Sequence, residues 1–284
     1  MQYEKKGSDE MKVITLVENT REREDLCQEH GLSLYIETKK HKILFDTGAG
    51  DCMVKNAKKL QVPLEEVDTV IISHGHYDHG GGLEDFLRMN KHANIYIHPE
   101  AFGHFYSERK DEGTVYIGLN QKLKDEKQFI WTADALRIDE ELFLFAKVTK
   151  RKHFPIGNRT LFVKTEEGFL PDYFRHEINL MIHESEKKVL VAGCAHNGIV
   201  NIINKAKELT QAYPTHVIGG FHLSKRSSGI KEDDLVIKAI GDYLIETGVM
   251  CYTGHCTGEK AFLQLKDILK HRIKALTTGL IINI

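Results

Sequence analysis

The chain has 284 residues, and 41% of them are hydrophobic, which is enough apolar material for one large domain with a sizeable core. Its formal net charge is −2, so no overall positive field favours a nucleic acid or an anionic membrane as partner. No apolar run approaches the roughly 20 residues that cross a bilayer, so we do not expect a membrane-spanning protein.

The cysteines give an indication of the compartment. They are irregularly spaced and odd in number, namely Cys27, Cys52, Cys194, Cys251 and Cys256. No N-terminal segment combines a basic start, an apolar stretch and a small-residue cleavage site. We therefore predict a reduced, cytoplasmic protein without a disulfide framework. Residues 1–11 are expected to form a disordered tail, since the regular pattern starts at Lys12.

The first half of the chain is typical of short strands around a helix. Apolar residues Met53, Ala57 and Leu60 follow the helical spacing of four and three. Segment 67–73 is a nearly continuous apolar run, as expected for a strand that is buried on both faces. The predicted strands are 12–18, 32–38, 42–46, 67–73 and 93–99, and the predicted helix is 51–61.

Residues 101–160 depart from this rhythm. They contain two charged stretches, several aromatic residues and the only tryptophan, Trp131. Two interpretations remain open for this segment: an insertion with a small core of its own, or a lid that forms a substrate wall.

The second half returns to alternating strands and helices. Segments 177–185 and 187–193 are predicted to form a hairpin. Amphipathic spacing predicts the helices that follow. The expected order is helix 199–209, strand 215–220, helix 231–246, strand 248–254, helix 259–270 and a short closing strand.

Histidines recur where apolar strands stop. His74, His196, His222 and His255 each follow a predicted strand and small residues. Loops at the carboxyl ends of strands are the places where a rigid scaffold presents reactive side chains. Most of the other histidines are expected on the surface, namely His41, His92, His104, His153, His176, His183, His216 and His271.

The densest cluster is the segment His-Gly-His-Tyr-Asp-His, residues 74–79. His74 and His76 are two apart and point to the same side of an extended segment, so they can share one ion. Asp78 and His79 can face a second ion, and zinc-like ions accept both imidazole nitrogen and carboxylate oxygen. Two ions about 3.5–4 Å apart could lower the pKa of a shared water molecule. The segment therefore predicts metal chemistry, with further ligands at His196 and His255.

The Asp46-Thr47-Gly48 turn and the motif at 74–79 resemble the metallo-β-lactamase superfamily. Further segments resemble one branch of it, the dihydropterin-6-methyl-(ribofuranosyl)aminobenzene-phosphate synthase-like metal-dependent hydrolases. These segments are EHGLS (29–33), HGHYDHGGGL (74–83), GCAHNGIVNI (193–202), GGFHL (219–223) and HCTGE (255–259). The resemblance implies an α/β (α+β) fold, a four-layer αββα sandwich with the metal site at one edge between the sheets. Residues 12–284 would form this single domain, with the insertion at about 101–160.

The resemblance also implies a ligand set for two divalent metal ions. Zinc is the expected metal, and iron and manganese are alternatives. The first ion would be held by His74, His76 and His196, and the second by Asp78, His79 and His255.

Two residues behind these ligands need separate treatment. Asp46 would support the ligands from a second shell or fix the turn. Cys194 stands where the wider superfamily has an aspartate that bridges both ions. A thiolate ligand and an inert buried cysteine both remain open for Cys194.

The function expected from these residues is a metal-dependent hydrolase that directs metal-activated water at a small, phosphorylated or pterin-like substrate. Asp78 would be catalytic by orienting the water. One alternative is a transferase that condenses a pterin diphosphate with an aminobenzene ribose phosphate. Another is a metal-containing sensor that binds a small molecule without turnover. The net charge disfavours a nuclease, and His76 replaces a Glu of oxygen-reducing relatives, which disfavours a di-iron redox centre.

Three peripheral features have two interpretations each. His222 is a candidate substrate contact or a structural residue, and His30 lines the site or fixes a turn. The loop 224–229 is small and basic, so it either holds a phosphate or is simply solvated. The substrate is expected to be a small molecule, and the sequence does not predict the oligomeric state.

Overall fold

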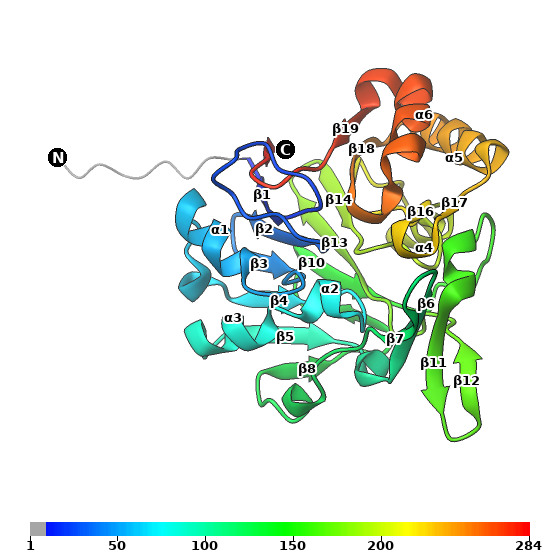
Figure 1. Ribbon diagram of the computed structural model, residues 1–284. Helices are drawn as coiled ribbons and strands as arrows, with labels where there is room; N and C mark the ends of the chain where they lie inside the picture. The colour runs from blue at the N-terminus through cyan, green and yellow to red at the C-terminus, as the bar shows by residue number, and fades with distance from the viewer. Residues whose placement is uncertain (1–9) are drawn as a thin grey trace.

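Two mixed sheets lie face to face in the computed structural model, which describes residues 10–284 (Figure 1). The first has the order β20-β1-β2-β3-β4-β5-β8. Its strands are β1 (Lys12–Val17), β2 (Ser33–Glu37), β3 (Lys42–Phe45), β4 (Thr69–Ile71), β5 (Asn94–Ile97), β8 (Phe129–Trp131) and β20 (Ile281–Asn283). The second has the order β19-β18-β15-β14-β13-β10-β9. Its strands are β9 (Ala135–Arg137), β10 (Leu142–Phe145), β13 (Asn179–Glu184), β14 (Lys187–Val191), β15 (His216–Ile218), β18 (Met250–Thr253) and β19 (Ile273–Ala275).

Helices cover the outer faces of both sheets. The helices on the first sheet are α1 (Cys52–Leu60) and α3 (Leu83–Met89), and a single turn, α2 (Tyr77–Gly80), precedes α3. Those on the second sheet are α4 (Ile199–Thr210), α5 (Asp234–Thr247) and α6 (Glu259–Leu269). No helix within residues 10–284 is both long and apolar enough to cross a bilayer.

The core is layered in the same way. Strand residues point alternately to opposite faces, so a strand with helices on one side and a sheet on the other is apolar throughout. Leu44 of β3, for example, packs outward against Met53 of α1, whereas its neighbour Phe45 packs inward against the second sheet. On the far side, Leu190 of β14 packs against Ile203 of α4. The four-layer αββα sandwich expected from the sequence is therefore confirmed.

A third, small sheet stands at the end of the sandwich that carries the loops (Figure 1). It has the order β12-β11-β6-β7, with β6 (Phe105–Arg109), β7 (Gly113–Tyr116), β11 (Leu161–Thr165) and β12 (Gly168–Pro171). The segment predicted as an insertion at about 101–160 thus divides. Its β6 and β7 belong to the small sheet, but β8 and β10 complete the two large ones. A two-stranded ribbon, β16 (Ser224–Lys225) and β17 (Ile230–Lys231), lies beside the small sheet.

The beginning of the chain partly tests the predicted tail. Residues 1–9 lie outside the described residues. Met11 is 1% exposed, and its carbonyl accepts a hydrogen bond from the backbone N–H of Ile284. Met11 thus belongs to the folded chain, directly before β1.

The prediction that the chain has no disulfide is wrong. Cys27 and Cys52 are paired, with their Cα atoms 5.4 Å apart. Asn56 explains how they meet, because its amide bonds the backbone N–H and carbonyl of Cys27 and so fastens the loop after β1 onto α1. Spacing along the chain could not reveal a contact that depends on this docking. Cys194, Cys251 and Cys256 are free and buried.

Candidate metal centre

The carboxyl ends of parallel strands bring the candidate residues together. Asp46 follows β3 and His74 follows the adjacent β4, which run parallel. Cys194 follows β14, and His255 follows β18, with β15 parallel between them. The backbone is strained here, since Asp46 (φ 59°) and His255 (φ 48°) adopt the left-handed conformation that non-glycine residues rarely occupy. Strain of this kind clusters at functional sites.

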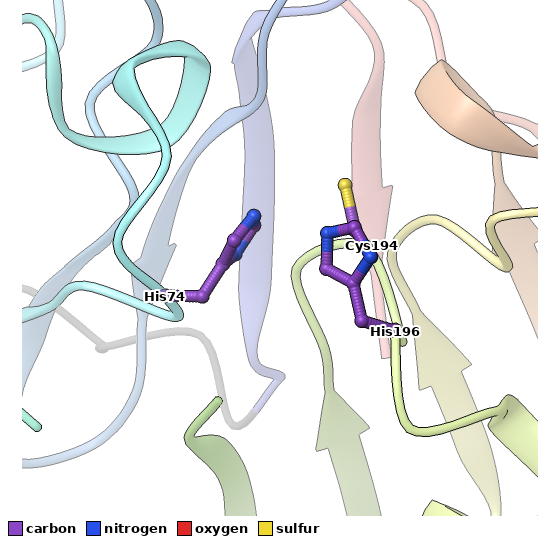
Figure 2. A group of neighbouring side chains, drawn as sticks. All are labelled: His74, Cys194 and His196. Atoms are coloured by element: carbon purple, nitrogen blue, oxygen red, sulfur yellow. The ribbon is translucent and has the colours of Figure 1, made fainter. Parts of the chain in front are cut away.

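The first three predicted ligands converge between the sheets. Nε2 of His74 lies 3.1 Å from Nδ1 of His76. The ring of His196 lies 4.8 Å from that of His74 and 5.0 Å from that of His76. All are buried, at 4% exposure or less. Figure 2 shows His74 on one side and His196, with Cys194, facing it from the other.

The other three predicted ligands also converge. Nε2 of His79 lies 3.3 Å from Nε2 of His255. Oδ2 of Asp78 lies 3.6 Å from Nε2 of His79 and 3.4 Å from Nε2 of His255. The Asp78 side chain retains 11% exposure, so this half of the site is open to solvent.

Cys194 lies between the two groups. Its sulfur belongs to one compact set with His74 and His196 and to a second with His79 and His255, in each of which the ligand atoms lie within 4.8 Å of one another. The sulfur is 3.1 Å from Nε2 of His79. Burial raises the pKa of the Cys194 thiol in the metal-free protein. A thiol that ligates a metal is deprotonated, so this position is suited to a ligand shared by two ions.

A network behind the ligands fixes which nitrogens face inward. The carboxylate of Asp46 accepts hydrogen bonds from Nδ1 of His79 (2.6 Å) and from the hydroxyl of Ser73 (2.7 Å). Because the hydroxyl donates to Asp46, it accepts from Nδ1 of His74, at 2.8 Å. Both imidazoles therefore carry their proton on Nδ1 and direct the Nε2 lone pair into the site.

Two asparagines repeat the arrangement on the other side. The amide oxygen of Asn158 lies 2.9 Å from Nδ1 of His196, and that of Asn19 lies 2.9 Å from Nδ1 of His255. An amide oxygen only accepts, so these Nδ1 atoms also donate and Nε2 again faces inward. Each asparagine also donates to the backbone carbonyl of its histidine.

The inward lone pairs indicate a cation. Nε2 of His79 and Nε2 of His255 lie 3.3 Å apart, so a proton or a metal ion must lie between them. Nε2 of His76 and Nε2 of His196 are buried without any hydrogen-bond partner. Buried nitrogens of this kind are destabilising unless something satisfies them. Imidazole, carboxylate and thiolate are ligands that zinc-like ions accept, so the residues fit a divalent metal.

The site has two halves, one with His74, His76 and His196 and one with Asp78, His79 and His255, and their charge differs. Burial lowers the pKa of His74 and of His196 well below the usual range and that of His76 to about 3, so these imidazoles stay neutral. Burial also acts on His255, but its hydrogen bond to Asp78 and the nearby charges outweigh burial and raise its pKa to about 9. Burial raises the pKa of Asp78, but the neighbouring histidines outweigh this and hold it well below the usual range.

Some residues that hold the candidate ligands in place were not predicted from the sequence. His176 was expected on the surface, and this was wrong, because it is 2% exposed. Its Nδ1 accepts the backbone N–H of Gly75 at 3.0 Å, and its Nε2 lies 3.0 Å from the Asp172 carboxylate. The next residue, Glu177, accepts the backbone N–H groups of His196 and Asn197 and holds that loop. The acidic and histidine residues of 172–177 were the available signal.

The two peripheral histidines occupy different positions. His30 has a side chain 60% exposed, with Nε2 3.3 Å from Oδ2 of Asp78, and its ring stacks on that of His255. His222 is 6% exposed, its ring lies 4.2 Å from that of His196, and neither of its ring nitrogens has a hydrogen-bond partner. Its backbone is also left-handed, with φ 50°.

Known proteins share this fold and are similar in sequence. The family model of the metallo-beta-lactamase superfamily matches residues 28–199, and the chain belongs to that superfamily. Within it, the chain is 30% identical to the 7,8-dihydropterin-6-methyl-4-(beta-D-ribofuranosyl)-aminobenzene-5'-phosphate synthase of Methanocaldococcus jannaschii, over 97% of both chains. The branch resemblance drawn from the motifs is thereby confirmed.

Solved structures agree. The crystal structure of Tm1679, described as a metal-dependent hydrolase of the beta-lactamase superfamily, superposes with a TM-score of 0.80 at 30% identity and covers 96% of this chain and 99% of its own. The metallo-beta-lactamase fold protein YhfI from Bacillus subtilis superposes with a TM-score of 0.56 at 14% identity, covering 96% and 99%. The second likeness supports the fold alone.

Proposed function

We propose that this protein is a metal-dependent hydrolase with a binuclear centre. The observation that supports it most is the set of imidazole Nε2 lone pairs of His74, His79 and His196 in the buried site, each fixed by an Nδ1 donor bond behind it. The similarity to a metal-dependent hydrolase over 96% of the chain supports the same reaction class.

The geometry supports one set of ligands. His74, His76 and His196 would hold one ion, and Asp78, His79 and His255 the other. Cys194 would contribute its thiolate to both, in place of a bridging carboxylate. Soft thiolate and imidazole ligands favour zinc over magnesium or calcium, with iron and manganese as alternatives. A pair of divalent ions here would supply Lewis acidity, which lowers the pKa of a water molecule and polarises a substrate oxygen.

The chain's own residues would complete the reaction. Asp78 retains contact with solvent, so its carboxylate is placed to orient a water molecule. Asp46 keeps His79 in one tautomer, and Asn158 does the same for His196. His222, with two unpartnered ring nitrogens beside His196, would contact the substrate.

The test combines metal content with turnover. We expect about two equivalents of divalent metal per chain by elemental analysis, and turnover of a member of a phosphoester and lactone panel that chelation abolishes and metal restores. His196→Ala should lose turnover and metal, whereas His92→Ala, at an exposed histidine outside the site, should behave as the unmodified protein. Turnover that survives complete chelation would contradict the proposal. Full metal occupancy, no turnover across the panel and tight binding of one small molecule would instead favour a sensor.

The similarity to a pterin-related synthase favours a second candidate, a transferase acting on a pterin diphosphate. In that case the metal centre would bind diphosphate, and condensation would replace hydrolysis. Calorimetry with a pterin and the metal-loaded protein separates the two candidates. Absence of any pterin binding would count against the transferase and leave the hydrolase unaffected.

A further inference from the structure

A partly buried lysine near the metal centre has no acidic partner. Lys225 lies at the end of β16, and its Nζ donates to the carbonyl oxygen of Thr160 (3.3 Å) and to its hydroxyl (2.5 Å). These oxygens are neutral, and within residues 10–284 no carboxylate forms an ion pair with this ammonium group. Burial of a charge without a counter-charge is destabilising, so the position is suited to an anion.

A second cation lies beside it. Arg109, at the end of β6, acts electrostatically on Lys225, and together with burial, the larger effect, it lowers the pKa of Lys225 to about 8. The Nε atom of Arg109 is buried without a hydrogen-bond partner. Its guanidinium pairs with Glu112, whose side chain is 59% exposed. Glu108 acts on Lys225 in the opposite sense and raises its pKa, but the side chain of Glu108 is exposed.

Backbone contacts hold the two cations together. The N–H of Lys110 donates to the carbonyl of Ser227 (3.2 Å), and the hydroxyl of Ser228 donates to the carbonyl of Glu108 (3.0 Å). The same hydroxyl lies 3.4 Å from the hydroxyl of Thr160. The end of β6, which carries Arg109, therefore lies against the loop that follows Lys225 and β16.

This group adjoins the metal centre. A Cβ atom added at Gly157 would lie 3.1 Å from Nε2 of His222 and 3.5 Å from Cβ of Lys225, so both side chains border the same glycine. The ring of His222 lies 4.2 Å from that of His196. Arg109 also acts electrostatically on Tyr77, which precedes Asp78 in the chain.

We infer that Lys225 and Arg109 form a subsite for the phosphate monoester end of a small substrate. An ammonium group and a guanidinium group from two different segments match a doubly charged phosphate better than a singly charged carboxylate, which one arginine satisfies. The inference rests on the proposed function, because it places the reacting end of that substrate at the metal centre. It also gives a role to the basic loop 224–229.

Calorimetry with ribose 5-phosphate, and ribose as the uncharged probe, tests the subsite in the metal-loaded protein. We expect Lys225→Met and Arg109→Met each to weaken ribose 5-phosphate binding at least about tenfold, since a charge-assisted hydrogen bond is lost. Lys225→Arg should retain most of the affinity. Lys231→Met is the matched control, because Lys231 is an exposed lysine that pairs with Ser224 in the same ribbon, and its removal should change binding less than about twofold.

The outcomes separate this inference from the proposed function. Unchanged binding in Lys225→Met, equal weakening in Lys231→Met, or no preference of the unmodified protein for ribose 5-phosphate over ribose would each overturn it. The melting temperature and the metal content of every variant must match those of the unmodified protein. If Lys225→Met does not fold, binding of ribose 5-phosphate by Lys225→Arg and Arg109→Met tests the subsite instead. Specific loss of binding in Lys225→Met in a protein that turns over no substrate would support the subsite and contradict the hydrolase.

Discussion

The two halves of the metal centre are built from different chemical groups. His74, His76 and His196 are neutral imidazoles, and the groups that fix His74 and His196 from behind are a hydroxyl and an amide. The other half contains the carboxylate of Asp78, and a second carboxylate, Asp46, lies behind His79. A cation in the second half therefore meets far more negative charge. We therefore expect metal affinity in the two halves to respond differently to pH and to mutation, although Cys194 is common to both.

Removing Cys194 should have the largest effect, because it is the one side chain common to both compact sets of ligand atoms. Loss of a group behind a ligand already weakens metal binding about 10–100-fold, so we expect Cys194→Ala to reduce metal affinity and turnover by more than about 100-fold. Elemental analysis after dialysis and steady-state kinetics measure both effects. Cys194→Asp, which restores a bridging carboxylate, should recover both. Retention of two equivalents of metal by Cys194→Ala would show that the cysteine is only a packing residue.

The pH dependence of metal binding should separate the halves. The pKa of His255 is raised to about 9, so below that pH a proton competes with metal, and affinity in its half should rise about tenfold per pH unit and level off above pH 9. The imidazoles of His74 and His196 have lowered pKa values and are already neutral, so in Cys194→Asp, which lacks the shared thiol, the other half should show no such rise between pH 7 and 9. Metal titrations across this range, repeated in buffers of different ionisation enthalpy, measure the released proton. Two steps with the same pH dependence would contradict the assigned charge difference.

The groups behind the histidines offer a paired comparison. Asp46→Asn replaces a carboxylate that accepts from both His79 and Ser73, and we expect metal affinity to fall about 10–100-fold. Asn158→Ala removes a neutral acceptor from His196, and its effect should lie near the lower end of that range. Competition with a chromogenic chelator measures the affinities, and thermal melting shows whether each variant is folded. A larger loss of metal affinity in Asn158→Ala than in Asp46→Asn would contradict the expectation that the carboxylate supports metal binding more strongly than the amide.

The sequence predicted the two halves to different extents. Four of the proposed ligand positions lie within residues 74–79, where local spacing and the strand before them predict which side chains share a side. The residues behind the candidate ligands were harder to find, since Asn19 lies 236 residues from His255 along the chain, and Asn158 lies 38 residues from His196. Only the closed sandwich brings such pairs together.

In the fold too, elements with a local sequence pattern were predicted, whereas contacts between distant parts of the chain were not. Strands such as 12–18 and helices such as 199–209 were found from period and composition, because their apolar faces are repeated along the chain. Residues 101–160 were not, because β6 and β7 pair with β11 outside that segment, while β8 joins the edge of a large sheet. The pairing of Cys27 with Cys52 depends on Asn56 in the same non-local way.

The smallest expected effect belongs to His30, at the solvent side of the second half. Its Nε2 is 3.3 Å from Asp78, but its side chain is 60% exposed, and exposed charge pairs contribute little. We expect His30→Ala to change metal affinity and turnover by less than about fivefold. His30→Gln, which keeps a hydrogen-bond donor, should stay closer to the unmodified protein in metal affinity and turnover.

His30, Asp78 and His255 nevertheless form a compact set of ligand atoms. A loss in His30→Ala as large as that in Cys194→Ala would therefore mean that His30 binds an ion itself, and that the second half holds its metal nearer the surface than the buried pair of His79 and His255.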